Sequence, residues 1–278
     1  MLLRALLLVV LALTTAAAQP VRSRMLVAAE WLAGHMKDPE IVTLHVARDR
    51  SAYDASHIPG ARFLPWSELA VTRNGIPNEL PPVAQLVELF ERLGVGDESR
   101  VILYGDSRGL AAARAFFTLD YLGHGDSAAL LDGGLEKWRA GGRPVTQEAP
   151  PERRGRLTPR LRPEVVVTLE VMRNPPSNLL LVDARSPADY SGVRIPGAAN
   201  LYWADSLAGK ENPVLRPASE LRAMFEAAGA APGRKIVTYC VTGVQASLAY
   251  FIARYLGYEA AMYDGSLAEW NTAGPGRR

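Results

Sequence analysis

The amino-acid sequence predicts an α/β protein made of two copies of one unit, each a small parallel sheet with helices on both faces. Two observations lead to this prediction: the sequence repeats itself, and short apolar runs alternate with amphipathic stretches in each copy. The chain has 278 residues, 48% of them hydrophobic and 22% charged. That length suits about two domains. The composition is typical of soluble globular proteins and excludes a disordered or fibrous chain.

The internal repeat spans most of the chain. Residues 46–66 align with residues 183–203 without a gap, and a second block of matches lies near the end of each copy. The matched residues are Arg48 with Arg185, Tyr53 with Tyr190, Ile58-Pro59-Gly60-Ala61 with Ile195-Pro196-Gly197-Ala198, Trp66 with Trp203, Asp132-Gly133 with Asp264-Gly265, and Trp138 with Trp270. We therefore expect a first domain at 25–147, a basic, proline-bearing linker at 148–164, and a second domain at 165–278.

The strands of each predicted sheet are short apolar, β-branched runs, as buried parallel strands require. In chain order they cover residues 41–44, 101–104 and 128–131 in the first copy, and 179–182, 236–239 and 260–263 in the second. Helical patterns lie between them. One helix is expected to continue from Ser247, because apolar residues recur there at spacings of three and four: Val244, Leu248, Phe251, Ile252 and Tyr255. Strands that alternate with helices are typical of a parallel sheet wrapped on both faces.

Residues 1–18 have the pattern of a secretory signal peptide. Arg4 precedes an apolar run at 5–13, and Ala16-Ala17-Ala18 provides small residues for cleavage before Gln19. We expect the mature chain to begin near Gln19 and the protein to be exported, either to the periplasm or out of the cell. A helix that spans a membrane needs about 20 apolar residues, and no run in the sequence is that long. No membrane span is therefore expected.

Charge and metal-ligating residues exclude two further classes of function. The formal net charge is +2, and residues 149–163 hold five arginines against one glutamate, so the rest of the chain has no basic field to attract nucleic acid. The chain has one cysteine, and its four histidines are scattered through the first half: His35, His45, His57 and His124. A metal site of the zinc type, built from cysteine and histidine, is therefore not expected.

Cys240 is the single cysteine of the chain. Exported proteins generally use cysteines in disulfide pairs, so an unpaired one is either a buried structural thiol or a working one. It follows the predicted strand 236–239 and precedes a helix, and Gly243 allows a tight turn between them. Backbone N–H groups of such a turn, together with the helix dipole, form a cradle for an anion. We expect a sulfur in this place to ionise easily and to be exposed to small molecules.

Together these features resemble a tandem-domain rhodanese, which is a sulfurtransferase. The resemblance covers nearly all of the chain after residue 18, and its most specific element is the six-residue loop that begins at Cys240. The motifs that carry it are Asp183-Ala184-Arg185, Arg194-Ile195-Pro196-Gly197-Ala198, Cys240-Val241-Thr242-Gly243-Val244-Gln245, and Tyr263-Asp264-Gly265-Ser266 followed by Glu269-Trp270. The resemblance implies a catalytic C-terminal copy and a degenerate N-terminal copy, in which Gly105 and Asp106 occupy the corresponding loop.

The resemblance implies a two-step transfer of sulfur without a metal or an organic cofactor. The Cys240 thiolate would attack the outer sulfur of a small sulfur-containing anion, become a persulfide, and pass the sulfur to cyanide or a thiol. Thr242 would either add its hydroxyl to the cradle or cap the following helix. Hydrogen bonds to the thiolate and the persulfide would come from the amides of the loop residues Val241, Thr242, Gly243, Val244 and Gln245.

A cation is expected to hold the anionic donor. Arg194, which takes the place of His57 in the first copy, either faces the site or lies on the surface; Arg185 either faces the site or forms an ion pair with the aspartate two residues before it.

Relatives that use thiosulfate often have a basic pair after the cysteine, and those that use 3-mercaptopyruvate often have a Gly-Ser pair; this chain has Val241-Thr242. Asp189 stands where the mercaptopyruvate type has an arginine, and a carboxylate cannot clamp a carboxylate. Thiosulfate is therefore the expected donor, with 3-mercaptopyruvate as the alternative.

Three other functions fit parts of the sequence. A thiol phosphatase would need an arginine where this chain has Ala246. A serine esterase is suggested by the G-x-S-x-G pattern at 105–109, but the only histidine after Ser107 is His124, which is too near and has no acid-bearing strand before it. The third function is a non-catalytic rhodanese-like module that binds a partner or relays sulfur from a protein persulfide. The protein is expected to be a monomer.

Overall fold

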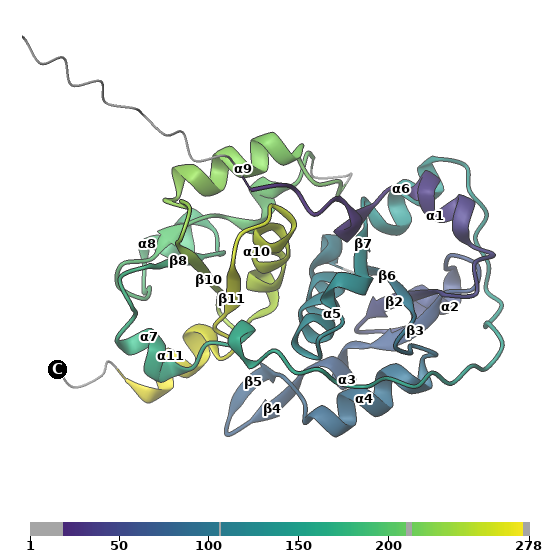
Figure 1. The fold of residues 1–278 in the computed structure, drawn as a ribbon, viewed down its shortest axis with the longest axis horizontal. Helices are drawn as coiled ribbons and strands as arrows, with labels where there is room; N and C mark the ends of the chain where they lie inside the picture. The colour runs from purple at the N-terminus through teal and green to yellow at the C-terminus, as the bar shows by residue number, and fades with distance from the viewer. Residues whose placement is uncertain (1–18, 106, 210–212, 275–278) are drawn as a thin grey trace, which may run out of the picture.

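The computed structural model describes residues 19–105, 107–209 and 213–274, and it shows two α/β domains packed against each other (Figure 1). The predicted signal peptide at 1–18 lies outside these residues. In the first domain, five parallel strands form a sheet in the order β1-β7-β6-β2-β3. Their bounds are Leu26–Val27 for β1, Ile41–Ala47 for β2, Arg62–Pro65 for β3, Arg100–Gly105 for β6 and Ala128–Leu131 for β7.

Helices cover both faces of this sheet because its central strands are apolar on both sides. Along β6, Val101 and Leu103 belong to one buried cluster, whereas Ile102 and Tyr104 belong to the other, as the two-residue period of a strand requires. The helices α1 (Ala29–His35) and α6 (Gly134–Ala140) pack on the second cluster; α3 (Trp66–Leu69), α4 (Val83–Arg92) and α5 (Leu110–Tyr121) pack on the first. A short helix, α2 (Arg50–Ala55), follows β2.

The second domain repeats this architecture around a parallel sheet in the order β11-β10-β8-β9. Its strands are β8 (Leu179–Asp183), β9 (Ala199–Asn200), β10 (Lys235–Tyr239) and β11 (Ala260–Met262), and its helices are α7 (Leu169–Arg173), α8 (Pro187–Ser191), α9 (Ala218–Ala227), α10 (Val244–Tyr255) and α11 (Ser266–Ala273). The predicted α/β fold with two tandem parallel sheets is confirmed. Helix α10 begins at Val244 rather than at Ser247, because Gly243 adopts the left-handed conformation (φ +79°) and turns the chain directly into the helix.

The two domains meet along equivalent helices, α5 and α10, which lie side by side between the sheets (Figure 1). Phe116 packs edge-to-face on Phe251 with ring centroids 4.9 Å apart, a geometry that aromatic pairs prefer. At one end of the helix pair, the buried Asp120 carboxylate accepts hydrogen bonds from Tyr250 Oη (2.5 Å) and Arg254 Nε (3.0 Å). Because each domain contributes the same element, the interface has the reciprocal character of a two-fold arrangement.

A hairpin of two antiparallel strands, β4 (Val71–Arg73) and β5 (Ile76–Glu79), extends from the first domain toward the second (Figure 1). Its turn residues Asn74 and Gly75 both have positive φ angles, 53° and 79°, which is typical of a tight hairpin turn built from Asn-Gly. The hairpin therefore has a defined direction, and it carries residues of the first domain to the strand ends of the second.

The basic linker is docked on the first domain. The Arg154 guanidinium is paired with the Glu88 carboxylate at 2.5 Å, and the Thr158 amide donates to Asp97 at 2.7 Å. Two of its arginines, Arg154 and Arg162, are thus paired with carboxylates of the same chain. Within the described residues, no helix combines the length and apolarity needed to cross a membrane.

Candidate active site

Cys240 follows β10 directly and begins the loop that leads into α10. The loop folds back on itself at Gly243, where a side chain would not fit: a Cβ there would lie 2.9 Å from Asp264 Oδ1. Two amides of the loop, those of Cys240 and Gly243, donate to the Ser266 hydroxyl at 3.2 and 3.1 Å. The expectation that the Gly243 amide belongs to an open cradle is therefore wrong, because Ser266 already accepts its hydrogen.

Other amides of the loop remain available for an anion. Val244, Gln245 and Ala246 are the first residues of α10, so their N–H groups have no acceptor within the helix. Among the described residues, they have no other acceptor either, and the same holds for the amides of Val241 and Thr242. Such a helix start, with its free N–H groups and positive dipole end, favours a negative charge. The loop thus presents five amides without an acceptor among the described residues, and anion binding by them stays a prediction.

The Cys240 thiol is buried rather than exposed. Only 1% of the residue is accessible, and it belongs to the apolar cluster that extends across both domains. The expected exposure is therefore wrong, because the interface between the domains closes over the end of β10. The adjacent residue Val241 is 50% exposed, and it marks where the loop meets solvent.

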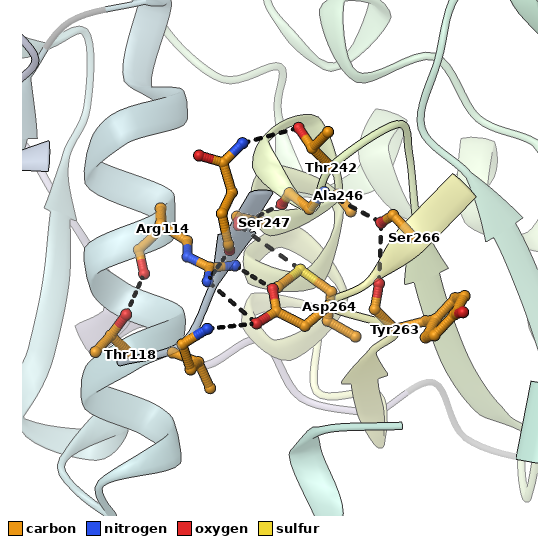
Figure 2. A network of polar contacts seen from close by, with 12 residues as sticks. Arg114, Thr118, Thr242, Ala246, Ser247, Tyr263, Asp264 and Ser266 are labelled. Atoms are coloured by element: carbon orange, nitrogen blue, oxygen red, sulfur yellow. Dashed lines mark hydrogen bonds and ion pairs between the residues drawn. The ribbon is translucent and has the colours of Figure 1, made fainter. Parts of the chain in front are cut away.

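The first domain contributes side chains to this loop, as Figure 2 shows. Asn78 of the β4–β5 hairpin donates from Nδ2 to the Thr242 hydroxyl at 3.0 Å. Arg114 of α5 points to Asp264 and forms a buried ion pair with its carboxylate. Thr242 does not cap α10, since Gly243 is the residue at the N-cap and no side chain accepts a bond there; its hydroxyl serves as the acceptor for Asn78 instead.

The two arginines considered for donor binding lie in different environments. Arg185 is held by Asp183, with Nε at 2.9 Å and Nη2 at 2.6 Å from the carboxylate oxygens, and it also donates to the Val193 carbonyl at 2.8 Å. It forms the ion pair that was the alternative to a substrate-binding role. Arg194 is exposed and its guanidinium lies 5.0 Å from the ring centre of Tyr190. Within the described ranges, no hydrogen bond or ion pair joins either arginine to the Cys240 loop.

Carboxylates are close to the covered side of the loop. Burial, together with the negative charges of Asp264 and Glu269, raises the pKa of Glu79 to about 7, and the positive charge of Arg114 opposes this shift. Glu79 is the last residue of the hairpin strand β5. The hairpin therefore brings a group that titrates near neutral pH to the side of Asp264.

The corresponding place in the first domain is built differently. Tyr104 Oη accepts from the Ile58 amide and Tyr239 Oη from the Ile195 amide, so the residues that follow these tyrosines, Gly105 and Cys240, are equivalent. A Cβ at Gly105 would lie 2.0 Å from the Val46 carbonyl oxygen, so the strand pairing leaves no room there for any side chain. Asp106, the second residue expected at this place, lies outside the described residues.

Sequence reasoning missed three of the residues at the site. Arg114 and Asn78 come from the other domain, and no local pattern links them to Cys240. Ser266 does have a signal in the sequence, because it replaces Gly134 in the otherwise matching Asp-Gly motif of the first copy. In the structure both residues have positive φ angles, 51° and 56°. A serine kept in a conformation that favours glycine indicates a local requirement for its hydroxyl.

Known proteins are similar to this chain in both sequence and fold. Residues 28–141 and 168–273 each match the family described as "Rhodanese-like domain". The chain is 34% identical over 275 residues to the "Sulfur carrier protein TtuD" of Thermus thermophilus, covering 88% of this chain and 93% of that one. It is 32% identical over 250 residues to the "Thiosulfate sulfurtransferase" of Azotobacter vinelandii, covering 86% and 91%. The crystal structure of SseA from Escherichia coli, described among 3-mercaptopyruvate sulfotransferases, is similar with a TM-score of 0.77, 26% identity, and coverage of 87% and 98%.

Proposed function

The chain belongs to the rhodanese-like domain family in a tandem form, and we propose that it is an enzyme that transfers sulfur from thiosulfate to a thiophilic acceptor through Cys240. The observation that carries this proposal is the position of the only thiol of the chain. Cys240 lies at the end of a parallel strand, beside a helix start whose amides have no acceptor among the described residues. Ligands of open α/β sheets bind at this edge.

The chemistry proceeds in two displacements at sulfur. The Cys240 thiolate attacks the outer sulfur of thiosulfate, the sulfur–sulfur bond of the donor breaks, and sulfite leaves with the electron pair. In the second step, cyanide or a thiolate attacks the terminal sulfur of the persulfide and restores the Cys240 thiolate. Each step passes a negative charge across the loop, where the α10 amides donate hydrogen bonds without reorganising.

The burial of Cys240 supports this chemistry in one respect and constrains it in another. A site that excludes water protects a persulfide from side reactions and strengthens hydrogen bonds to its charge. The constraint is access: donor and acceptor have to enter where Val241 is exposed. A small anion such as thiosulfate suits a thiol that is 1% exposed better than a large substrate does.

Two observations support thiosulfate over 3-mercaptopyruvate as the donor. The chain is 32% identical to a protein named thiosulfate sulfurtransferase. Asp189, at the position where a carboxylate-binding arginine would be expected, accepts from the Ser186 hydroxyl at 2.6 Å in the first turn of α8, so it presents a negative charge there. 3-Mercaptopyruvate remains the second choice of donor.

A sulfur-relay function is the competing proposal. Its support is the 34% identity to a protein named sulfur carrier, together with the exposed apolar side chain of Val241 beside the thiol. In this function Cys240 would receive its sulfur from a persulfide on another protein and would not turn over small donors.

An assay of thiocyanate formation from thiosulfate and cyanide separates the two proposals. We expect turnover by the wild type and a loss of at least about a thousandfold in Cys240→Ser, because the hydroxyl of serine is not ionised at neutral pH. The control is Ser191→Ala, which changes an exposed hydroxyl on α8. No turnover with any small donor, combined with sulfur uptake from a protein persulfide, would favour the relay function.

We further propose that the protein is exported after cleavage near Gln19, on the basis of the basic start, apolar run and small residues within positions 1–18. Expression in a Gram-negative host, followed by N-terminal sequencing of the periplasmic fraction, tests this: export predicts a new N-terminus near Gln19, and an uncleaved chain in the cytoplasm contradicts it. That the protein is a monomer stays a prediction.

A further inference from the structure

We propose that Arg114, a residue of the domain without a thiol, is a positioning residue for the Cys240 loop. The proposal rests on the proposed function of that loop, and it adds to the site a side chain that the first domain supplies. Arg114 has no access to solvent. It acts through other residues, and the geometry shows which ones.

The guanidinium of Arg114 joins two segments that hold the loop. It is paired with both carboxylate oxygens of Asp264, and its Nη2 also donates to the Asn78 carbonyl at 2.6 Å. The planar, fixed fork of arginine suits such simultaneous contacts, whereas a single ammonium group does not. The same cation therefore sets the position of Asp264 relative to the hairpin strand β5.

Each of these segments then contacts the loop. Asp264 lies against Gly243, since a Cβ at that glycine would be 2.9 Å from Asp264 Oδ1 and 3.2 Å from Arg114 Nη1. Two residues after Asp264, the Ser266 hydroxyl accepts from the Cys240 and Gly243 amides. On the other side, the Asn78 side chain donates to Thr242. Arg114 thus binds one residue next to each contact: Asp264, two residues before Ser266, and Asn78, whose side chain reaches Thr242. Figure 2 shows Arg114 pointing to Asp264, with Ser266 and Thr242 nearby.

Among the described residues, the other half of the interface lacks a buried ion pair of this kind; its aspartate, Asp132, lies 4.0 Å from the partly exposed Lys137 of its own domain. There, Asp132 is equivalent to Asp264: it accepts from the Leu215 amide at 2.9 Å, as Asp264 accepts from the Leu80 amide at 3.0 Å. The equivalent of Arg114, five residues after the N-cap glycine, is Leu248 on α10. Leu248 and Asp132 line a cavity of about 30 Å³ at the thiol-free loop.

This asymmetry argues against a purely structural role for the ion pair. The interface packs with a leucine in the equivalent position, and a buried ion pair is in general no more stabilising than well-packed apolar residues. The pair occurs at the loop that holds the thiol. In addition, Arg114 Nε is buried without a partner among the described residues, so the side chain is placed for its contacts with Asp264 and Asn78 rather than for full hydrogen bonding.

The test is the double variant Arg114→Leu/Asp264→Asn, which copies the leucine of the other half and keeps an oxygen for the Leu80 amide. Because it removes one positive and one negative charge, the net local charge is unchanged. Both proteins carry Glu79→Gln in this comparison, because the pKa of Glu79, about 7, depends on Asp264 and Arg114 and its titration would otherwise enter the pH profile. The readouts are the pH dependence of Cys240 alkylation by iodoacetamide and the rate of sulfur uptake from thiosulfate in a single turnover. We expect the pH midpoint of alkylation to move upward and sulfur uptake to slow on the order of tenfold to a hundredfold.

The matched control is Arg254→Met. Arg254 also forms a buried ion pair across the interface, with Asp120 at 3.0 Å, but it lies near the far end of α10, about 15 Å along the helix from Val244. We expect this variant to lower the thermal midpoint while leaving the alkylation profile and sulfur uptake as in the wild type. A second variant, Arg114→Lys, keeps the charge without the fork and is expected to slow sulfur uptake as well.

Positioning by Arg114 is refuted if the double variant has the wild-type alkylation profile and rate, or if Arg254→Met changes both to the same extent. Alkylation does not depend on sulfur transfer, so the two proposals fail separately. If the wild type is alkylated normally but takes up no sulfur from thiosulfate, the proposed donor is contradicted. The role of Arg114 is then decided by the alkylation profiles of the wild type and the variants alone.

Discussion

The loops after β6 and β10 occupy equivalent places in two domains of the same fold, yet the chain's one thiol lies in the second loop. Both run from a parallel strand through a left-handed glycine, Gly109 or Gly243, into a helix of the same length, α5 or α10. The second domain has Cys240 where the first has Gly105, and at the start of α11 it has the acceptor Ser266 where the first has Gly134 at the start of α6. The fold thus supplies the turn and the helix dipole twice, and a few side chains decide which copy can react.

The comparison also shows that the thiol-free domain takes part in the site. Each domain sends a segment over the loop of the other: Leu80 donates to Asp264, and Leu215 donates to Asp132. Within the part of the chain that the structure describes, a buried ion pair and a hydrogen bond to the loop from Asn78 accompany the first of these contacts and not the second. The repeat without a thiol thus contributes side chains to the Cys240 loop and to the segment behind it.

The largest effect is expected from an attempt to make the two loops alike. Gly105→Cys would place a Cβ about where the Val46 carbonyl oxygen lies, at 2.0 Å, so the strands β2 and β6 would have to separate. We expect a loss of about 3 kcal/mol in the free energy of unfolding and no second reactive thiol. Denaturant unfolding and alkylation of the variant measure both; a stable variant with two reactive thiols would contradict the account.

A smaller effect is expected at the acceptor of the loop amides. Ser266→Gly makes this position like Gly134 and removes the conformational strain of a serine with a positive φ. It also leaves the buried amides of Cys240 and Gly243 without their acceptor. We expect stability to change by about 1 kcal/mol, because the two effects oppose each other, and sulfur transfer to fall by about tenfold. Steady-state kinetics check this. Gly134→Ser is the matched change in the other copy, and it should leave the rate unaltered.

The smallest effect concerns the titration of Glu79 in the hairpin. Its pKa is raised from 4.5 to about 7 in the folded protein, so between these values the folded state binds more protons than the unfolded chain does. The free energy of unfolding therefore falls as the pH rises through this window. Glu79→Gln removes this fall, and we expect it to stabilise the protein by about 1 kcal/mol at pH 8, a modest value because solvent screens the half-buried group. Unfolding curves at about pH 5 and about pH 8 test it, and an equal dependence in both proteins would contradict it.

Much of the fold follows from the sequence because its signals are local. The apolar runs at 101–104 and 236–239 became the central strands β6 and β10, since a strand buried on both faces has few other interpretations. The repeat and the glycine after Cys240 likewise located the turn between β10 and α10. These features depend on residues close together in the chain.

The rest of the site depends on packing between distant segments. The burial of Cys240 could not be predicted, because the residues that cover its loop belong to another domain. Arg114 is one of two charged residues in the otherwise largely apolar helix α5, and nothing near it in the sequence indicates a partner 150 residues away. Arg185 could have faced a donor or Asp183, and only the geometry of the strand end shows that Asp183 holds it.

The most direct test of the whole account is the mass of the native protein after exposure to thiosulfate without an acceptor. The account predicts the addition of one sulfur atom, mapped to the peptide that contains Cys240 and removed by cyanide. A protein that gains no sulfur under native conditions, although Cys240 is alkylated normally once the chain is unfolded, would show that the buried thiol is structural and would contradict the account.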